Sequence, residues 1–338
     1  MNGPWLLRGR DGSLSTYATR DEAVWCRAER QPSLHWTSAR RVGGEQRVRA
    51  QLAVGQGPDG YAHLVAWRPT VRGEFGLVHS THFRPHLSAL DWVPIGHPNK
   101  KGDRTGLPAV AVDAEGRAHV FVRNQGGGVS MLAQKERGGW GPWHDLGGLG
   151  AHEELAAVTG HSGRIELYAT TDDGLLRWSQ EKPGEALVPD DALEARVRPG
   201  TLTALHNSKA DGTALFFTDP EGMLHTWRPG GVPRPLLAAA GPGPVAALGC
   251  VVDGRACTLL AQRSASGRVV ICVCPTEQGS VGLRWTESGP QLPAGSRVAV
   301  AEDAQGRVVA ASLTEDGELR LARQKDGTGP ALDTWQTV

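Results

Sequence analysis

The 338-residue sequence predicts an all-β protein, a seven-bladed β-propeller with four antiparallel strands in each blade. Short runs of alternating apolar residues, such as AHVFV and RIELYA, recur along the chain and are bounded by DG, EG and SG turns. A glycine turn that follows an apolar strand also recurs, at intervals of 42 to 56 residues. Its positions are Gly12, Gly60, Gly116, Gly163, Gly212, Gly254 and Gly306.

Each repeat is expected to supply its four strands in a fixed order. An apolar inner strand precedes the glycine turn, a second strand follows it, and a second turn such as TDDG, TDPEG or TEDG leads to a third strand. A fourth, outer strand opens with tryptophan in several repeats: Trp36, Trp92, Trp143, Trp285 and Trp335. The repeats divide one predicted domain, residues 1–338, into blades at about 1–45, 46–98, 99–150, 151–198, 199–242, 243–292 and 293–338.

Charge and hydropathy exclude several classes of protein. Lys plus Arg and Asp plus Glu both number 36, so the net charge is zero and argues against non-specific binding of nucleic acid. No run of 18 apolar residues predicts a membrane span. The opening MNGPWLLRGRDG does not resemble a signal peptide, so a cytoplasmic location is expected, with the five cysteines present as thiols.

The eleven tryptophans outnumber both the three tyrosines and the five phenylalanines. Two of them, Trp140 and Trp143, lie three apart in GGWGPWHDLGG, residues 138–148. A wide indole at the start of an outer strand can cover the gap between neighbouring sheets, which favours a packing role. An indole in the glycine-rich connection can instead present a ring face to a ligand, and this second interpretation fits Trp140.

The third repeat, from Leu107 to Gly148, is the most complete, and it resembles the repeat of bacterial seven-bladed β-propeller lectins of the fucose-binding PLL type. The segments that carry the resemblance are HVFVRN at 119, GGWGPWHDLGG at 138, DGLLRWSQ at 173 and EGMLHTWRP at 221. The pattern extends over all seven repeats, although repeats four and five lack the closing tryptophan and repeat two has the longer segment TVRGEFGLVHSTHF.

This resemblance implies shallow sugar pockets between neighbouring blades, with aromatic rings and a few polar partners. The matching positions are Trp36, Trp92, Trp140, Trp143, Trp178, Trp227, Trp285 and Trp335, together with Arg177 and His225. Because the blades have diverged from one another, we expect one or two pockets near blade three, or one specialised site. The leading hypothesis is therefore a lectin-like protein that binds a sugar or another small ligand.

Two other functions remain open. A cytoplasmic lyase, isomerase, hydrolase or cyclase would use one site at a mouth of the propeller channel. The predicted strand entries at one mouth carry Arg49, Thr105, His152, Glu153, Glu154 and Arg297, of which His152, Glu153 and Glu154 are the densest group. The other mouth carries Arg10, Gln56, Asp113, His161, His206, Asn207 and Asp303. The third possibility is a scaffold that binds a protein partner on one face.

Metal and cofactor chemistry find little support in the sequence. His79, His82 and His86 lie in VHSTHFRPH, which we interpret as a surface insertion rather than a divalent-metal site. Repeat six contains Cys250, Cys257, Cys272 and Cys274, which we interpret as small buried apolar residues. The sequence has no P-loop, dinucleotide-binding glycine motif, nucleophile elbow or H-E-x-x-H motif, so no cofactor is expected.

Overall fold

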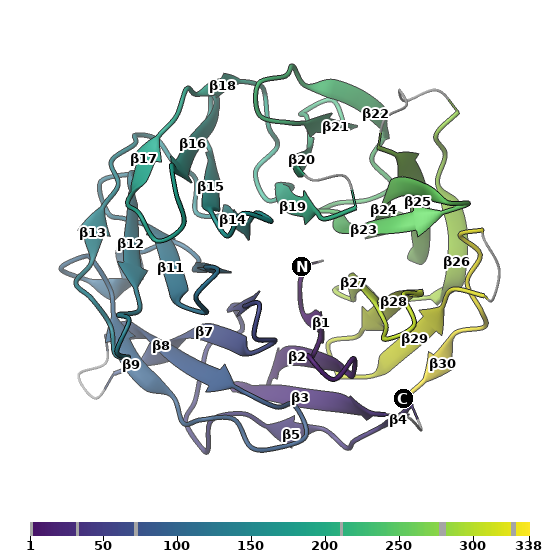
Figure 1. Ribbon diagram of the computed structural model, residues 1–338, viewed down its shortest axis with the longest axis horizontal. Helices are drawn as coiled ribbons and strands as arrows, with labels where there is room; N and C mark the ends of the chain where they lie inside the picture. Colours follow the sequence, from purple (N-terminus) through teal and green to yellow (C-terminus); the bar gives the residue numbers. More distant parts are fainter. Residues whose placement is uncertain (1–2, 32–33, 71–73, 210–211, 277–281, 326–328) are drawn as a thin grey trace. The chain divides into compact units, whose positions relative to one another are not determined.

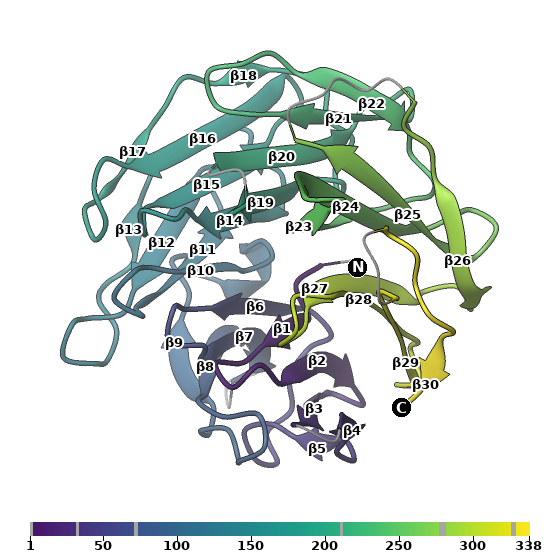
Figure 2. The ribbon, with the colours of Figure 1, turned by 45° about the vertical axis from the view of Figure 1, so that its right-hand side comes forward.

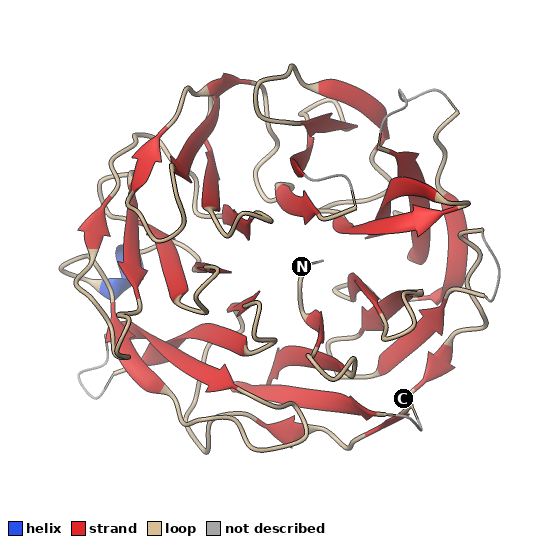
Figure 3. Cartoon of the chain, viewed as in Figure 1, coloured by secondary structure: helices blue, strands red, loops and turns tan. Residues whose placement is uncertain are grey.

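The computed structural model describes residues 3–31, 34–70, 74–209, 212–276, 282–325 and 329–338. It confirms the predicted fold, a seven-bladed β-propeller with four antiparallel strands per blade. Strands and loops make up nearly all of the described chain, and its single helical turn is the 3-10 helix η1 (Gly102–Arg104) (Figure 3). Within these residues, no helix has the length and apolar character needed to cross a membrane.

The chain divides into two compact units, Ser15–Ala195 and Met1–Leu14 with Arg196–Val338. The unit Ser15–Ala195 holds most of blade one and all of blades two, three and four (Figure 1). Blade one has the strand order β1-β2-β3-β4, and β5 also pairs with β3. Its strands are β1 (Leu6–Arg8), β2 (Leu14–Arg20), β3 (Ala23–Arg30), β4 (His35–Trp36) and β5 (Arg40–Arg41).

Blades two to four repeat the same order from the inner to the outer strand. Blade two consists of β6 (Leu52–Gln56), β7 (Ala62–Pro69), β8 (Phe75–His82) and β9 (Val93–Gly96). Blade three consists of β10 (Ala109–Val112), β11 (Ala118–Arg123), β12 (Val129–Ala133) and β13 (His144–Asp145). Blade four consists of β14 (Leu155–Thr159), β15 (Ile165–Thr170), β16 (Gly174–Gln180), β17 (Leu187–Pro189) and β18 (Leu193–Glu194), the last of which pairs with β16.

Blades five, six and seven belong to the other unit (Figure 2). Blade five consists of β19 (Thr203–Asn207), β20 (Gly212–Thr218), β21 (Met223–Trp227) and β22 (Arg234–Ala238). Blade six consists of β23 (Ala246–Val252), β24 (Arg255–Arg263), β25 (Arg268–Pro275) and β26 (Thr286–Gln291). Blade seven consists of β27 (Arg297–Glu302), β28 (Val308–Leu313), β29 (Leu319–Arg323) and β30 (Gln336–Thr337). Each blade is thus built from one continuous stretch of chain.

The turn between the first two strands of a blade explains part of the repeat. In blade three the Asp113 carboxylate accepts hydrogen bonds from the backbone N–H groups of Glu115 and Arg117, at 3.0 and 2.9 Å. Gly116 completes this turn with a φ of +80°, a conformation that costs glycine little. Asp303 binds its own turn in the same way in blade seven, which explains why Asp and Gly recur together.

The apolar core lies between neighbouring blades. Between blades two and three it includes Val65, Trp67 and Val120, and between blades three and four it includes Phe121 and Trp178. Threonine hydroxyls link the inner strands of adjacent blades by donating to backbone carbonyls. Examples are Thr159 to Val112 and Thr203 to Val245, each at 2.7 Å. The alternating strands therefore bury side chains on both faces, as stacked sheets require.

One interpretation of the sequence is wrong. The segment that contains His79 and His82 is not a surface insertion, because it forms the regular strand β8, which pairs with β7 over its whole length. His79 and His82 are only 5% and 1% exposed. Both faces of this strand are buried, so its histidines lie inside the protein although histidine is often found on the surface.

Candidate functional site

Five tryptophans share one contact; four lie beside outer strands, and Trp178 lies on the third strand of blade four. The indole N–H of each donates to the blade that precedes it in the chain. The bonds run from Trp92 to the Val42 carbonyl (3.1 Å), Trp143 to the Ile95 carbonyl (3.3 Å), Trp178 to the Leu146 carbonyl (2.9 Å), Trp285 to the Ala238 carbonyl (2.8 Å) and Trp335 to the Ser288 hydroxyl (3.1 Å). These bonds support the packing role for this set of tryptophans.

Glycine in the preceding blade makes room for several of these indoles. Gly43 has a φ of +70°, and a Cβ atom on it would lie 2.3 Å from Trp92. Gly289 has a φ of +79°, and a Cβ atom on it would lie 2.5 Å from Nε1 of Trp335. Both the left-handed backbone and the close approach of the ring therefore require glycine at these positions. The indole and the glycine form one unit of inter-blade packing.

The tryptophans that were predicted to bind ligand differ in exposure. Trp92, Trp178 and Trp227 are 3%, 1% and 7% exposed, so their rings lie inside the protein. Trp36, Trp140, Trp143, Trp285 and Trp335 are half-buried. The half-buried set is the one that can still offer a ring surface to a ligand.

Trp140 packs against the neighbouring blade more closely than its glycine-rich surroundings suggest. Its ring meets His79 of blade two edge to face, with the ring centroids 4.9 Å apart. It also bridges to Gln134 and contacts the apolar core between blades two and three. Its role as a ligand platform stays a prediction.

The two polar residues that were predicted beside these tryptophans bind protein groups. Arg177 donates to Glu166 at 3.1 Å and lies 3.5 Å from the Asp190 carboxylate. His225 contacts the Asp219 carboxylate at 2.8 Å and stacks on Phe217, with centroids 5.4 Å apart. Both side chains are therefore oriented by their own blades.

The residues predicted at one channel mouth are held locally. Nδ1 of His152 lies 2.9 Å from the Thr170 hydroxyl, and Nε2 lies 3.0 Å from the Asp172 carboxylate. Thr170 is only 2% exposed, so its hydroxyl orients the imidazole but is closed to a substrate. Burial raises the pKa of the neighbouring Glu154, whereas Glu153 is exposed. The structure thus supplies one oriented imidazole at this position.

The two arginines predicted for the same mouth have different surroundings. The guanidinium of Arg49 lies over the Phe75 ring, 3.3 Å from its centroid, in a cation–π contact. Burial lowers the pKa of Arg297, and the nearby Glu315 carboxylate partly offsets this effect. The catalytic role of both arginines stays a prediction.

At the other predicted mouth, Asp113 and Asp303 stabilise turns. Both carboxylates are fully buried. Burial acts to raise the pKa of Asp113, but hydrogen bonds from His119 and Arg117 outweigh burial and lower it to about 2. The charges that the sequence suggested for acid–base work are thus paired within the protein at this position.

The buried histidines and cysteines do not gather into a large ligand set. His79 hydrogen-bonds to His63 at 3.1 Å, whereas His82 hydrogen-bonds to the Tyr17 hydroxyl at 2.9 Å. All five cysteines are free and buried, as expected for small apolar residues. Across the described ranges, no three His, Cys, Asp or Glu side chains come together in a way that would hold a metal ion.

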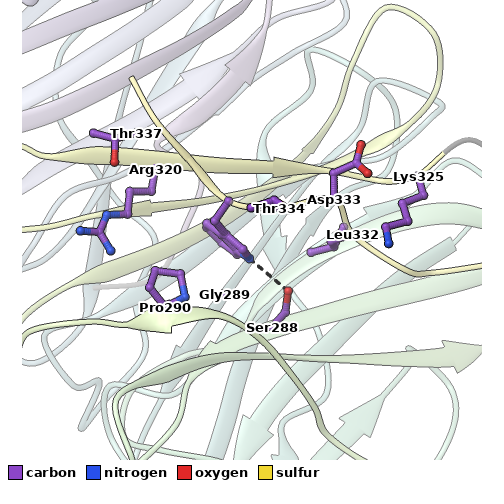
Figure 4. Close-up of a pocket in the computed structure, with 10 residues that line it drawn as sticks. Ser288, Gly289, Pro290, Arg320, Lys325, Leu332, Asp333, Thr334 and Thr337 are labelled. Carbon is purple, nitrogen blue, oxygen red and sulfur yellow. Dashed lines mark hydrogen bonds between the residues drawn. The ribbon is translucent and has the colours of Figure 1, made fainter.

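A cavity of about 490 Å³ opens where the outer strand of blade six faces that of blade seven (Figure 4). Strand β26 contributes one wall, and β29 with the segment that leads to β30 contributes the other. The lining residues are Ser288, Gly289, Pro290, Arg320, Lys325, Leu332, Asp333, Thr334, Trp335 and Thr337. Pockets of several hundred Å³ are the usual size for small-molecule sites.

The cavity combines one indole with balanced charge. Trp335 lines the cavity, and its N–H bond to the hydroxyl of Ser288, the dashed line in Figure 4, fixes the ring. Arg320 forms an ion pair with Glu318, and Lys325 and Asp333 add one charge of each sign to the lining. Arginine and carboxylate groups together can satisfy the donors and acceptors of a polyhydroxylated ligand.

Trp335 belongs to the set of tryptophans that match the lectin repeat, but its polar neighbours were not predicted. Arg320 follows the TEDGE turn, and Asp333 lies two residues before the tryptophan in LDTW. Arg320 stands three residues after its turn glycine, as Arg177 does in repeat four, so the repeat could have marked this position. Asp333 has no counterpart two residues before the other outer-strand tryptophans, so the repeat does not reveal it.

Comparison with known proteins gives the fold a distant set of structural relatives. No family model matches the sequence, and no curated protein matches it. The lectin BP39L from Burkholderia pseudomallei is similar over 98% of this chain and 97% of its own, with a TM-score of 0.72 and 14% identity. The fucose-specific lectin from Aleuria aurantia is similar over 87% of this chain and 96% of its own, with a TM-score of 0.51 and 12% identity.

A third structure extends this set. The SapL1 lectin, in complex with α-methyl fucoside, is similar over 86% of this chain and 96% of its own, with a TM-score of 0.50 and 14% identity. The chain is therefore a distant structural match to fucose-binding β-propeller lectins. At these identities the similarity establishes the fold, and function depends on the site.

Proposed function

We propose that this protein is a lectin that binds a neutral sugar in the cavity between the outer strands of blades six and seven. The observation that carries this proposal is the half-buried Trp335 in a cavity of about 490 Å³ that also holds arginine, lysine and aspartate side chains. A monosaccharide presents one apolar face and several hydroxyls, which are the features this lining complements. Two distant structural relatives, a fucose-specific lectin and a lectin bound to a fucoside, support the sugar class.

The polar groups favour a neutral ligand. Arg320 is paired with Glu318, so its charge is already compensated while some of its N–H groups can still donate. Lys325 and Asp333 oppose each other in sign within the same lining. An anionic sugar would gain little from such a site, because no net positive charge faces it.

The apolar side of the site is held in place before any ligand binds. Trp335 donates to Ser288 and rests over Gly289, where a side chain would collide with the ring. Fixing an aromatic ring in advance reduces the entropy lost on binding. A stacked aromatic face adds about 0.5–1.5 kcal/mol beyond burial, so we expect weak, roughly millimolar affinity for a monosaccharide.

A titration of the full chain tests this proposal. L-Fucose, methyl α-L-fucoside, D-galactose and D-mannose are each added, and binding is followed by calorimetry and tryptophan fluorescence. Arg320→Ala removes the guanidinium and should weaken binding at least about tenfold, since a hydrogen bond to a charged group contributes about 1.5–3 kcal/mol. Arg196→Ala is the control, because Arg196 is exposed and its ion pair with Glu221 lies outside the cavity lining.

Trp335→Ala should abolish binding, and Trp143→Ala is its matched control. Trp143 holds the same place in repeat three but donates to a backbone carbonyl and does not line the cavity. Absence of saturable binding by all four sugars would overturn the lectin proposal. Binding that survives both Arg320→Ala and Trp335→Ala would keep the lectin function but reject this cavity, and Trp140→Ala would then test the alternative pocket in blade three.

A further inference from the structure

Two cysteines of blade six form a close pair that the proposed sugar site does not use. Cys272 and Cys274 lie on β25 with one residue between them, and their sulfur atoms are 3.9 Å apart. Residues two apart on a strand point to the same face, so the contact follows directly from the C-x-C spacing. Both thiols are free, and they are 2% and 8% exposed.

We propose that Cys272 and Cys274 form a two-coordinate binding site for a soft monovalent metal ion, with Cu(I) as the biological candidate. Binding replaces two S–H bonds by two S–Cu bonds and releases two protons to solvent. Copper stays in the +1 state, so the step needs neither an oxidant nor a reductant. The resulting bis-thiolate centre carries one negative charge.

The sulfurs are close to each other, but a two-coordinate ion needs them farther apart. With metal–sulfur bonds of about 2.3 Å, a linear arrangement places the sulfurs roughly 4.6 Å apart, against the 3.9 Å seen here. Rotation about the Cα–Cβ bonds of the two cysteines can supply the difference. The backbone of β25 need not move.

The surroundings select against zinc. Structural zinc takes four nitrogen or sulfur ligands, and the described residues hold no cluster of three or more His, Cys, Asp or Glu suited to a metal. The pair instead packs with Phe216, Leu224 and Leu260 in the core between blades five and six. Soft thiolates favour Cu(I), for which two ligands are enough.

One further feature favours the site. Cys274 lies one residue before the end of β25 and is the more exposed member of the pair, so it is the thiol nearer to solvent. Trp285 packs against the same cluster, so copper at the pair should quench part of the tryptophan fluorescence.

Cys250 and Cys257 provide a matched control within the same blade. They lie opposite each other on β23 and β24, and they pack with Val298 and Val308 of blade seven rather than with blade five. The experiment is an anaerobic titration of the full chain with Cu(I) against a competing Cu(I) chelator. It follows the ultraviolet thiolate-to-copper absorption and the total tryptophan fluorescence.

We expect one Cu(I) per chain in the wild type and in Cys250→Ser. Cys272→Ser and Cys274→Ser should each reduce affinity at least about a hundredfold, because a single thiolate cannot complete the site. Failure of the wild type to retain copper against the chelator would overturn the proposal, as would equal losses in all three variants.

If a serine variant fails to fold, X-ray absorption of the copper-loaded wild type still tests the proposal, because it reports the type and number of atoms bound to copper. Two sulfur neighbours at one short distance are expected. Nitrogen or oxygen neighbours, or three or more sulfurs, would contradict the assignment. The sugar titration is independent of this result, because none of these cysteines lines the cavity.

Discussion

The pairing of an indole with a glycine in the preceding blade predicts a measurable coupling between Gly43 and Trp92. Trp92 is 3% exposed and donates to the carbonyl of Val42, directly before this glycine. Gly43→Ala places a methyl group 2.3 Å from the indole at a φ of +70°. The substitution therefore combines backbone strain with a collision, and only the collision depends on the tryptophan.

Gly44 separates these two contributions. Its φ is +74°, but a Cβ atom there would come no closer than 3.4 Å to Asp91. Gly44→Ala should cost the backbone strain alone, about 1–2 kcal/mol. Gly43→Ala should cost this amount plus the collision, which we place at a further 1–3 kcal/mol, roughly the cost of overpacking a core. Trp92→Ala should cost about 3–5 kcal/mol.

The decisive quantity is the double variant Gly43→Ala/Trp92→Ala. Removal of the indole also removes the collision, so the double variant should be more stable than the sum of the single effects by at least about 1 kcal/mol. Urea unfolding followed by circular dichroism gives each free energy of unfolding, provided that the slopes agree. Equal costs for Gly43→Ala and Gly44→Ala, or strict additivity in the cycle, would refute the role assigned to the glycine.

Three further results are expected. Trp143→Ala should cost less than Trp92→Ala in the same urea assay, because Trp143 is half-buried; an equal or larger cost would contradict this ranking. Asp113→Asn should cost about 1–3 kcal/mol through its contacts to Arg117 and His119, whereas Asp172→Asn, at an exposed carboxylate, should be nearly neutral. Burial lowers the pKa of His63 to about 4 and that of His79 to about 3, below the value near 6.5 that histidine has in an unfolded chain. The free energy of unfolding should therefore be unaffected by these histidines above pH 6.5 and should fall as the pH drops from 6.5 toward their folded-state pKa values. At about 1.4 kcal/mol per pKa unit, His63 alone should lower the free energy of unfolding by roughly 3 kcal/mol over this pH range. A His63→Phe/His79→Phe variant whose free energy of unfolding depends on pH as steeply as that of the wild type would contradict the role of these histidines.

The fold could be predicted because the residues within each repeat indicate its strands and its turns. Gly116 and Asp113 mark a turn that needs both a positive φ and a carboxylate, and such pairs recur along the chain. The outer tryptophans could likewise be assigned to packing, since Trp143 and its equivalents hold one place in the repeat. These features are local, so a single sequence displays them.

The candidate site could be predicted only in part because it joins residues from separate repeats. Trp335 was identifiable from the repeat, but Ser288 and Gly289 come from the blade before it. Burial also cannot be read from the residue type. Trp92 holds the same place in its repeat as Trp335, yet its ring is inside the protein. The C-x-C spacing likewise predicted that Cys272 and Cys274 point to the same face of their strand, but it did not predict the distance between their sulfurs.

The most direct test of the proposed function is a crystal structure of the full chain soaked with methyl α-L-fucoside. We predict a sugar in the cavity between blades six and seven, with its apolar face against Trp335 and its hydroxyls within hydrogen-bond distance of Arg320 and Asp333. An empty cavity in crystals that carry the fucoside at Trp140 or at any other position would contradict the assignment of this cavity. Crystals that bind no sugar, together with flat titrations in solution, would contradict the lectin function itself.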